Sequence, residues 1–369
     1  MNHTALFLLA IFCLCGCRTN EIFCNKNKKF DRLFCWGSPA NENEAARFAA
    51  AGVTDLPVKN LKQYEWAKKY GMNAYWNIFL PTGPYKQVLT ADEQKHYDYI
   101  SGTDLNSGIP YNERMKILHQ RRKEKQHLYG GDTVTEIATI ANYQIACFSS
   151  DDDFTLTEKK LDNMLDKAPA DAAGMFMDFT GYTNLHGCYC PKCLFKYQNY
   201  LKSNKLPDNA ANRGMFYLEE IISYYNRVID YVKSKRHNYK IVIHVYPLFK
   251  NAPLHGNRTK ADYCGQTVSW YFKWDGEKIR KYTDYVIKHA KDYYLTAEGL
   301  PFIGLSTDKN SSLGYKTPED IDFELRTILQ RGATSVMVCN GREILKDGYF
   351  EVFKKYCAAD KQLEQTKKH

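Results

Sequence analysis

Residues 156–179 read LTEKKLDNMLDKAPADAAGMFMDF, and this stretch contains the repeating unit that decides the fold. Apolar residues recur at helical spacing over 156–167, and the apolar run 175–179 has the length and composition of a buried strand. Strands that alternate with helices in this way predict parallel pairing, because a helix is the usual connection between two parallel strands. The fold class therefore depends on how often this unit recurs.

Seven further strands are predicted from β-branched and aromatic runs that end in turn residues, at 33–36, 53–56, 73–79, 241–246, 267–272, 302–306 and 335–339. Helical patterns alternate with them, among them 43–51, 61–70, 215–235, 279–294, 318–330 (with Thr317 as its cap) and 350–357. Eight strands, each followed by a helix, predict an α/β fold of the (β/α)8 (TIM) barrel type. An open doubly wound sheet is the alternative. It needs a Gly-rich phosphate loop after the first strand, and Gly37-Ser38-Pro39 is not one.

Length and composition suit a single large domain. The chain has 369 residues, of which 44% are hydrophobic and 14% aromatic, and its formal net charge is +9. A (β/α)8 barrel uses roughly 250 residues and often more with insertions, and this hydrophobic content excludes global disorder. The basic residues are scattered and form no stripe, so nucleic acid is not a predicted partner. The high aromatic content is typical of sugar-binding clefts.

The N-terminus predicts a lipoprotein-type signal peptide over residues 1–17. Residues 5–14 form an apolar run too short to cross a bilayer, and Leu14-Cys15-Gly16-Cys17 resembles a bacterial lipobox, with Cys17 as the lipid anchor. Residues 18–31 are predicted to be a tether and residues 32–369 the barrel domain. The mature protein is then expected outside the cytoplasm, anchored to a bacterial membrane. An ordinary cleaved signal peptide is the alternative.

One insertion interrupts the alternation of strands and helices. Residues 80–148 separate the third strand from its helix and are too long for a plain connection. They contain a basic helical stretch at 112–126, the pair Gly130-Gly131 and an apolar run at 137–148. The insertion follows the carboxyl end of a barrel strand, where active-site loops lie. We expect a lid or a cleft wall, with a passive surface decoration as the alternative.

The most specific motif is His186-Gly-Cys188-Tyr-Cys190-Pro-Lys-Cys193, directly after the fourth strand. Three thiolates within six residues can bind one tetrahedral Zn²⁺, and a fourth ligand must come from elsewhere. Cys147, which ends the apolar run before the fourth strand and its helix, is the best candidate, and His186 is its rival. In an oxidising compartment, a disulfide between Cys147 and one of the three is the alternative. Each of these roles is structural.

These residues resemble family 42 of the glycoside hydrolases, the β-galactosidase barrels. Several members bind zinc through one Cys after the third strand and a Cys-x-Cys-x-x-Cys after the fourth. Cys147-Phe-Ser-Ser stands at the place of the first of these ligands, and its distance from Cys188 is close to that in the family. The resemblance covers residues 140–201, and elsewhere it concerns the fold alone. It implies a barrel that hydrolyses glycosides and holds a structural zinc.

Four carboxylates are candidates for catalysis. Asp178 ends the fourth strand, where the resemblance implies a Glu as acid/base, and Asp is one methylene shorter, about 1.5 Å. The second carboxylate of that family is a Glu at the end of the seventh strand, and Asp308 follows this end here. Asp275 after the sixth strand and Glu343 after the eighth are rivals. A pair formed by Asp178 on the fourth strand and Asp275 after the sixth resembles instead the α-galactosidase-type barrels, and this resemblance implies Asp178 as nucleophile and Asp275 as acid.

Aromatic and polar residues recur at the ends of the predicted strands. An apolar sugar face stacks on such rings, while polar groups bind hydroxyls. The predicted substrate-binding residues are Trp36, Trp76, Asn77, His244, Tyr246, Trp270, Trp274 and Asn340. The chain has no Gly-x-Ser-x-Gly motif, no phosphate loop and no dinucleotide fingerprint, so no organic cofactor is predicted.

Two functions follow from these observations. The first is a glycoside hydrolase that acts on an oligo- or polysaccharide outside the cytoplasm by carboxylate acid/base chemistry. The second is a catalytically inactive barrel that binds carbohydrate as a surface lipoprotein, and the absence of Glu at position 178 favours it.

Overall fold

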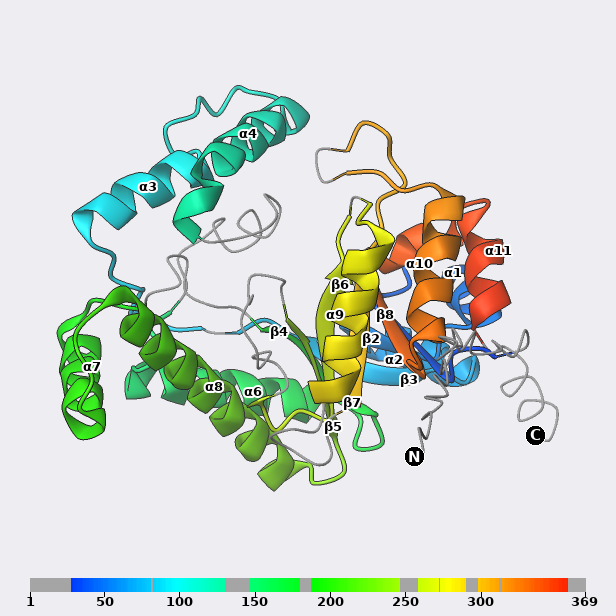
Figure 1. The fold of residues 1–369 in the computed structure, drawn as a ribbon. Helices are drawn as coiled ribbons and strands as arrows, with labels where there is room; N and C mark the ends of the chain where they lie inside the picture. Colours follow the sequence, from blue (N-terminus) through cyan, green and yellow to red (C-terminus); the bar gives the residue numbers. More distant parts are fainter. Residues whose placement is uncertain are drawn as a thin grey trace, which may run out of the picture.

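The computed structural model describes residues 28–80, 82–129, 146–179, 187–245, 258–271, 273–289, 298–311 and 314–357. Eight parallel strands close into a barrel in the order β1 to β8 (Figure 1). The predicted (β/α)8 barrel is confirmed. The strands are β1 (Arg32–Cys35), β2 (Asp55–Val58), β3 (Asn73–Ile78), β4 (Gly174–Phe179), β5 (Lys240–Val245), β6 (Tyr263–Ser269), β7 (Glu298–Gly304) and β8 (Ser335–Cys339).

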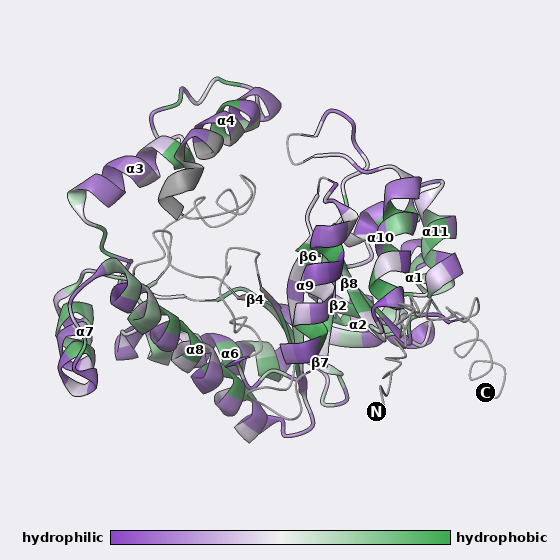
Figure 2. Ribbon diagram, in the orientation of Figure 1, coloured by the Kyte–Doolittle hydropathy of each residue, from purple (hydrophilic) through white to green (hydrophobic). Residues whose placement is uncertain are grey.

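Helices surround the barrel, and two more lie apart from it. The surrounding helices are α1 (Glu42–Ala50), α2 (Leu61–Lys69), α6 (Asp151–Lys167), α7 (Pro191–Asn204), α8 (Ala210–Lys235), α9 (Gly276–His289), α10 (Pro318–Gln330), the 3-10 turn η2 (Gly341–Leu345) and α11 (Tyr349–Tyr356). Helices α3 (Ala91–Ser101) and α4 (Tyr111–Tyr129) belong to the segment between β3 and β4. They project beside the barrel as an arm, and they are mostly hydrophilic (Figures 1 and 2).

Helix α6 shows how local sequence and packing agree. Ser150 caps its N-terminus by accepting a hydrogen bond from the Asp153 amide, and the acidic first turn suits the positive end of the helix dipole. Phe154, Leu161 and Leu165 recur on one face and are buried. The predicted cap at Thr317 is also confirmed, as part of a capping box in α10.

Strand β6 begins four residues earlier than predicted. Its register with β5 starts at Tyr263, whose ring packs 5.1 Å from that of Phe34 inside the barrel. An irregularity between Thr267 and Ser269 ends the regular pairing before Trp270. Trp270 and Tyr271, which the prediction included in the strand, therefore follow it.

Side chains fill the interior of the barrel. Near the amino ends of the strands, Arg32 Nε donates to Asp55 Oδ2 at 3.0 Å, and Arg32 Nη2 donates to the Tyr75 hydroxyl at 2.9 Å. Burial disfavours the charged guanidinium, yet the hydrogen bond and the charge of Asp55 raise the pKa of Arg32 overall. Toward the carboxyl ends, His244 stacks on Phe302 with ring centroids 3.9 Å apart. The described interior of the barrel is therefore occupied by side chains, and a substrate site is expected at its mouth.

A fully buried ion pair joins β6, β7 and α10. Lys316 Nζ donates to Glu324 Oε2 at 2.9 Å, to Ser269 Oγ at 3.0 Å and to the Gly304 carbonyl at 2.8 Å. Burial lowers the pKa of Lys316 and raises the pKa of Glu324, while each charge offsets part of this effect on the other. All three donor positions of this ammonium are satisfied inside the protein.

The N-terminal predictions mostly concern residues that the structure does not describe. The signal peptide, with Cys17, lies outside the described residues, as does the tether up to residue 27. Phe30 is buried and forms a parallel bridge with Cys357. No helix among the described residues has the length and apolar character of a membrane span.

Candidate functional site

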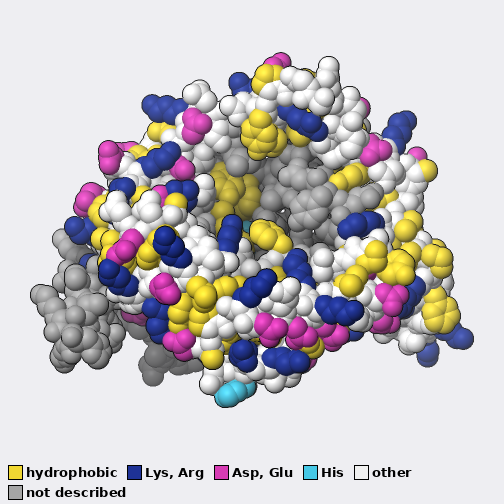
Figure 3. Space-filling model, turned by 180° about the vertical axis from the view of Figure 1, so that it is seen from behind, with side chains coloured by type: hydrophobic (Ala, Val, Ile, Leu, Met, Phe, Trp, Pro, Cys, Tyr) yellow, Lys and Arg dark blue, Asp and Glu magenta, His cyan; other side chains and the backbone are white. Residues whose placement is uncertain are grey.

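The carboxyl ends of the eight strands meet at one end of the barrel, where (β/α)8 enzymes place their active sites. The arm of α3 and α4 stands on this side of the molecule (Figure 1). Seen from behind, the surface is hollowed near its centre, with apolar and basic side chains around the hollow (Figure 3).

Most of the predicted aromatic contacts are buried. Trp76, His244, Trp270 and Trp274 are between 2% and 5% exposed. Their rings fill the barrel beneath its mouth or pack beside it, and their contact with a ligand stays a prediction. Asn340 is exposed, and Tyr246 lies outside the described residues.

Trp36 and Asn77 are both half-buried at the mouth. The Trp36 ring packs edge-on against Phe176 with centroids 4.5 Å apart, and the Gly341 amide donates to the Trp36 carbonyl at 2.9 Å. The Asn77 Oδ1 atom is buried without a hydrogen-bond partner among the described residues. A buried amide oxygen of this kind is costly unless a ligand or water donates to it, which marks Asn77 as a candidate contact.

Asp178 lies in β4, two residues beyond Phe176 and in register with His244 of β5. This is the last part of the strand before the mouth, as the sequence predicted. The side chain of Asp178 lies outside the described part of the structure. Its catalytic role therefore stays a prediction that rests on its position in the strand.

Asp308 and Asp275 are exposed and stabilise local backbone. Asp308 Oδ1 accepts a hydrogen bond from the Asn310 amide at 2.9 Å in the turn after β7. Asp275 Oδ1 accepts from the Lys278 amide at 2.8 Å, the pattern of an N-cap, at the start of α9. These bonds give both carboxylates a structural role, and their catalytic role stays untested.

Glu343 is the most enclosed of the three rivals, with a side chain 18% exposed. It lies in η2 after β8, accepts a hydrogen bond from the Thr307 hydroxyl, and lies 3.2 Å from Lys346 Nζ. Thr307 follows β7, so the carboxylate is held at the junction of the last two strands. Because η2 is also bonded to Trp36, Glu343 lies near the best-placed aromatic residue of the mouth.

Two features of the mouth were not foreseen. Phe79, directly after β3, is 54% exposed and offers a more accessible ring than Trp76. The Tyr271 hydroxyl lies 3.0 Å from Cys339 Sγ, which joins the ends of β6 and β8. Nothing in the sequence indicates that Phe79 is exposed. Tyr271 and Cys339 are 68 residues apart, so the sequence does not indicate their contact either.

The predicted cysteine cluster forms. The sulfur atoms of Cys147, Cys188, Cys190 and Cys193 all lie within 4.8 Å of one another. Cys147 Sγ is 3.5 Å from Cys193 Sγ and 4.0 Å from Cys190 Sγ, far beyond a disulfide bond of about 2.05 Å. None of the four forms a disulfide bond. His186 lies outside the described residues.

The donor set and its surroundings suit a metal ion. The hydrogen bond with Cys147 and burial raise the pKa of Cys188 to about 12, and a bound cation would favour the thiolate form. Backbone donors surround the sulfurs, among them the Val88 amide, which is 3.2 Å from Cys188 Sγ. Such donors to ligand atoms are typical of metal sites. The cluster could therefore hold one metal ion.

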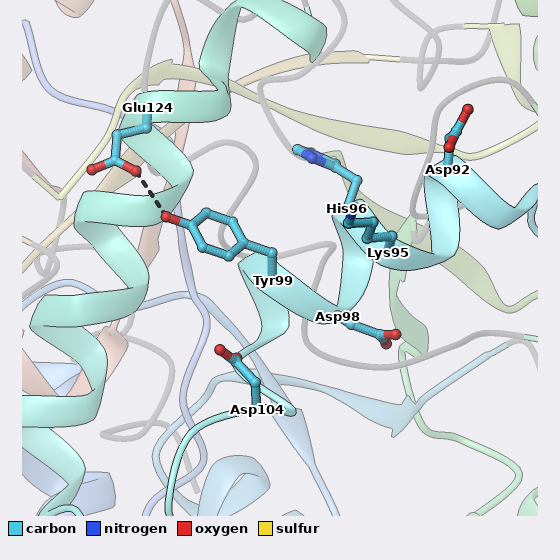
Figure 4. Close-up of a pocket in the computed structure, with 7 residues that line it drawn as sticks. All are labelled: Asp92, Lys95, His96, Asp98, Tyr99, Asp104 and Glu124. Atoms are coloured by element: carbon cyan, nitrogen blue, oxygen red, sulfur yellow. Dashed lines mark hydrogen bonds between the residues drawn. The ribbon is translucent and has the colours of Figure 1, made fainter.

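A cavity of about 710 Å³ lies on the arm (Figure 4). It is lined by Asp92, Lys95, His96, Asp98, Tyr99, Asp104 and Glu124. Most of its acidic groups are engaged within the arm: Asp104 bonds Arg121 at 2.6 Å, Asp98 bonds Gln94 at 2.8 Å, and Glu124 bonds the Tyr99 hydroxyl at 2.9 Å. The bond between Tyr99 and Glu124 joins α3 to α4, the bond of Asp104 joins the intervening loop to α4, and the bond of Asp98 lies within α3. None of these contacts assigns a ligand to the cavity.

Neither a family model nor a curated protein sequence matches the chain. Among solved structures, it is similar to the glycoside hydrolase domain of PgaB from Bordetella bronchiseptica, with a TM-score of 0.55 and 9% identity over 89% of this chain and 99% of that one. It is also similar to the β-galactosidase of the Antarctic haloarchaeon Halorubrum lacusprofundi, with a TM-score of 0.53 and 11% identity over 88% of this chain.

A family 42 β-galactosidase from G. stearothermophilus has a TM-score of 0.50 and 9% identity over 93% of this chain. The chain spans only 57% and 58% of the two β-galactosidase chains. At such identities the likeness shows the fold alone. The resemblance to family 42 therefore holds for the parallel barrel and for the presence of the cysteine cluster, and the chain has the fold of glycoside hydrolase barrels.

Proposed function

We propose that this protein is a glycoside hydrolase that acts on an oligo- or polysaccharide outside the cytoplasm. The observation that carries the proposal is the barrel fold, which is that of glycoside hydrolase barrels, together with the chain positions of Asp178 near the carboxyl end of β4 and of Glu343 directly after β8. Strands β4 and β8 lie on opposite sides of the closed barrel of eight strands. Glycosidases place a pair of carboxylates on either side of the scissile bond.

In this proposal each residue has a distinct role. Asp178 donates the proton to the leaving oxygen, and Glu343 acts as the nucleophile or base. The hydrogen bond from Thr307 orients the Glu343 carboxylate, and the ring of Trp36 provides an apolar surface for a sugar face. Asn77 offers its buried amide oxygen to a hydroxyl.

Carbohydrate binding without catalysis is the second candidate. It is favoured by an Asp at position 178, whose carboxyl group reaches about 1.5 Å less far than that of Glu. A panel of aryl glycosides and polysaccharides, assayed for released reducing ends and for binding, separates the two. Hydrolysis supports the enzyme, binding without hydrolysis supports the second candidate, and the absence of both contradicts carbohydrate as the ligand.

We further propose that the metal is a structural Zn²⁺. Four sulfurs at about 2.3 Å from a tetrahedral zinc are separated by about 3.8 Å, and the distances of 3.5 and 4.0 Å from Cys147 Sγ to two of the others bracket this value. When bound, the ion offsets part of the negative charge of the thiolates. The cysteines, in turn, hold together the loops after β3 and β4.

Elemental analysis should find about one zinc per chain. Cys190 is the least buried ligand, so Cys190→Ser disturbs packing least, and it should lose the zinc and lower the unfolding midpoint. Cys264→Ser, which changes a cysteine in β6 outside the cluster, should keep the metal. Metal-free wild-type protein with Cys147 in a disulfide would contradict zinc.

Anchoring through Cys17 is also a proposal. It rests on the lipobox-like sequence alone, because these residues lie outside the described part of the chain. Intact-mass analysis of protein from a bacterial host should show a mature chain that begins at Cys17 and carries a lipid. A chain cleaved elsewhere, or an unmodified Cys17, would show that the anchor is absent.

A further inference from the structure

Residues 85–88, here called the strap, connect β3 to the arm and run beside the cysteine cluster. The Cys147 amide donates to the Tyr85 carbonyl at 2.7 Å, and Lys86 pairs with Ala146 in an antiparallel bridge. One side of the strap is therefore bonded to the chain that carries the first cysteine of the cluster.

The other side of the strap is bonded to the loop that carries the remaining cysteines. The Val88 amide donates to Cys188 Sγ at 3.2 Å, and the Tyr189 amide donates to the Val88 carbonyl at 2.9 Å. The Gln87 side chain, 3% exposed, donates through Nε2 to the Gly187 carbonyl at 3.1 Å. The strap thus lies between the two segments that supply all four sulfurs.

The arm starts immediately after the strap. Thr90 caps α3 in a capping box with Glu93, and the Tyr189 hydroxyl donates to Glu93 Oε1 at 3.3 Å. Tyr189 stands between two of the cysteines, so the first turn of the arm also contacts the cluster loop. Among the described elements, α3 and α4 pack mainly against each other.

We propose that the metal ion in the cysteine cluster fixes the α3–α4 arm beside the mouth of the barrel. The inference rests on the proposed metal site and extends it to a part of the chain that contributes no ligand. The ion joins the segment of Cys147 to the loop of Cys188, Cys190 and Cys193, and the strap is hydrogen-bonded to both of them. Removal of the ion releases the two segments from each other, so the strap between them holds the first turn of the arm less firmly.

Hydrogen exchange measured by mass spectrometry on the full chain tests this coupling. In the zinc-loaded protein, the peptides of α3 and α4 should be protected, and chelation should speed their exchange at least about tenfold while α10 and α11 change little. Elemental analysis of the same samples records the zinc content. If the protein binds zinc, and its verified removal leaves hydrogen exchange in the arm unchanged, the coupling between the metal and the arm is wrong while the metal site stands.

A pair of variants tests the strap itself. Val88→Pro removes the amide that donates to Cys188 Sγ, and it should speed exchange in the arm while zinc stays near one per chain. Val88→Ala keeps the amide and should behave like the wild type. If hydrogen exchange in the arm is equally slow in both variants, the strap does not attach the arm to the cysteine cluster. Failure of the reconstituted protein to bind zinc at all would overturn the metal site and the coupling together.

Discussion

The Asp178→Asn variant should hydrolyse its substrate at least about 100-fold more slowly than the wild-type protein, while still binding it. Asparagine keeps the shape of the side chain and removes the proton that the leaving oxygen requires. The wild-type rate should fall at alkaline pH as the acid loses its proton, and the variant should lack this limb of the pH profile. Initial rates of reducing-end release on the substrate found in the panel provide the measurement.

Two further variants identify the partner of Asp178. Glu343→Gln should also lower the rate at least about 100-fold, because the second carboxylate is lost. Asp308→Asn changes an exposed carboxylate that bonds a turn amide, and it should stay within about twofold of the wild type. A near-normal rate in Asp178→Asn would place the chemistry on another residue. A large loss of rate in Asp308→Asn, with a near-normal rate in Glu343→Gln, would show that Asp308 and not Glu343 is the second carboxylate.

The Lys316→Met variant should lose about 3–5 kcal/mol of unfolding free energy. Lys316 and Glu324 are 0% and 1% exposed, so removing the ammonium leaves a buried carboxylate without its counter-charge. The Ser269 hydroxyl and the Gly304 carbonyl lose a donor in the same step. Urea denaturation of the variant and the wild type provides the measurement.

The matched control is Lys68→Met, which breaks an exposed ion pair with Asp171, and it should cost only about 0–1 kcal/mol. The double variant Lys316→Met/Glu324→Met should recover most of the lost stability, because apolar side chains of similar volume replace buried ion pairs without a charge left over. If the unfolding free energy of Lys316→Met is within about 1 kcal/mol of that of the wild type, the buried pair contributes little and this interpretation is wrong.

The barrel was predictable because its signals are local. Each strand is a short apolar run, and caps such as Thr317 depend on residues within one helical turn. The cysteine cluster was predictable for a related reason, since three of its four members lie within six residues. The exact start of β6 was not predictable, because Tyr263 belongs to the strand through its pairing with Val242 of β5 and Glu298 of β7, which are distant in the sequence.

The candidate site was predicted less completely than the fold. Strand position selected Asp178 and favoured Asp308 as its partner, ahead of Asp275 and Glu343. Our proposal of Glu343 rests on tertiary contacts, since Glu343 is enclosed by a bond from Thr307, whereas the other two accept bonds from neighbouring amides. Burial likewise distinguishes Trp36, which follows β1 and is half-buried, from Trp76, which lies within β3 and is 5% exposed.

The sequence by itself determined the eight strands, the helices between them and the spacing of the cysteines, because these depend on the periodicity and chemistry of neighbouring residues. Only the tertiary structure decided which groups meet across the barrel: Lys316 with Glu324, Thr307 with Glu343, and the strap with the cysteine cluster. Val88 and Cys188 are 100 residues apart, and a backbone amide leaves no mark in the sequence. Such contacts arise when barrel closure brings distant segments together, and periodicity carries no information about them.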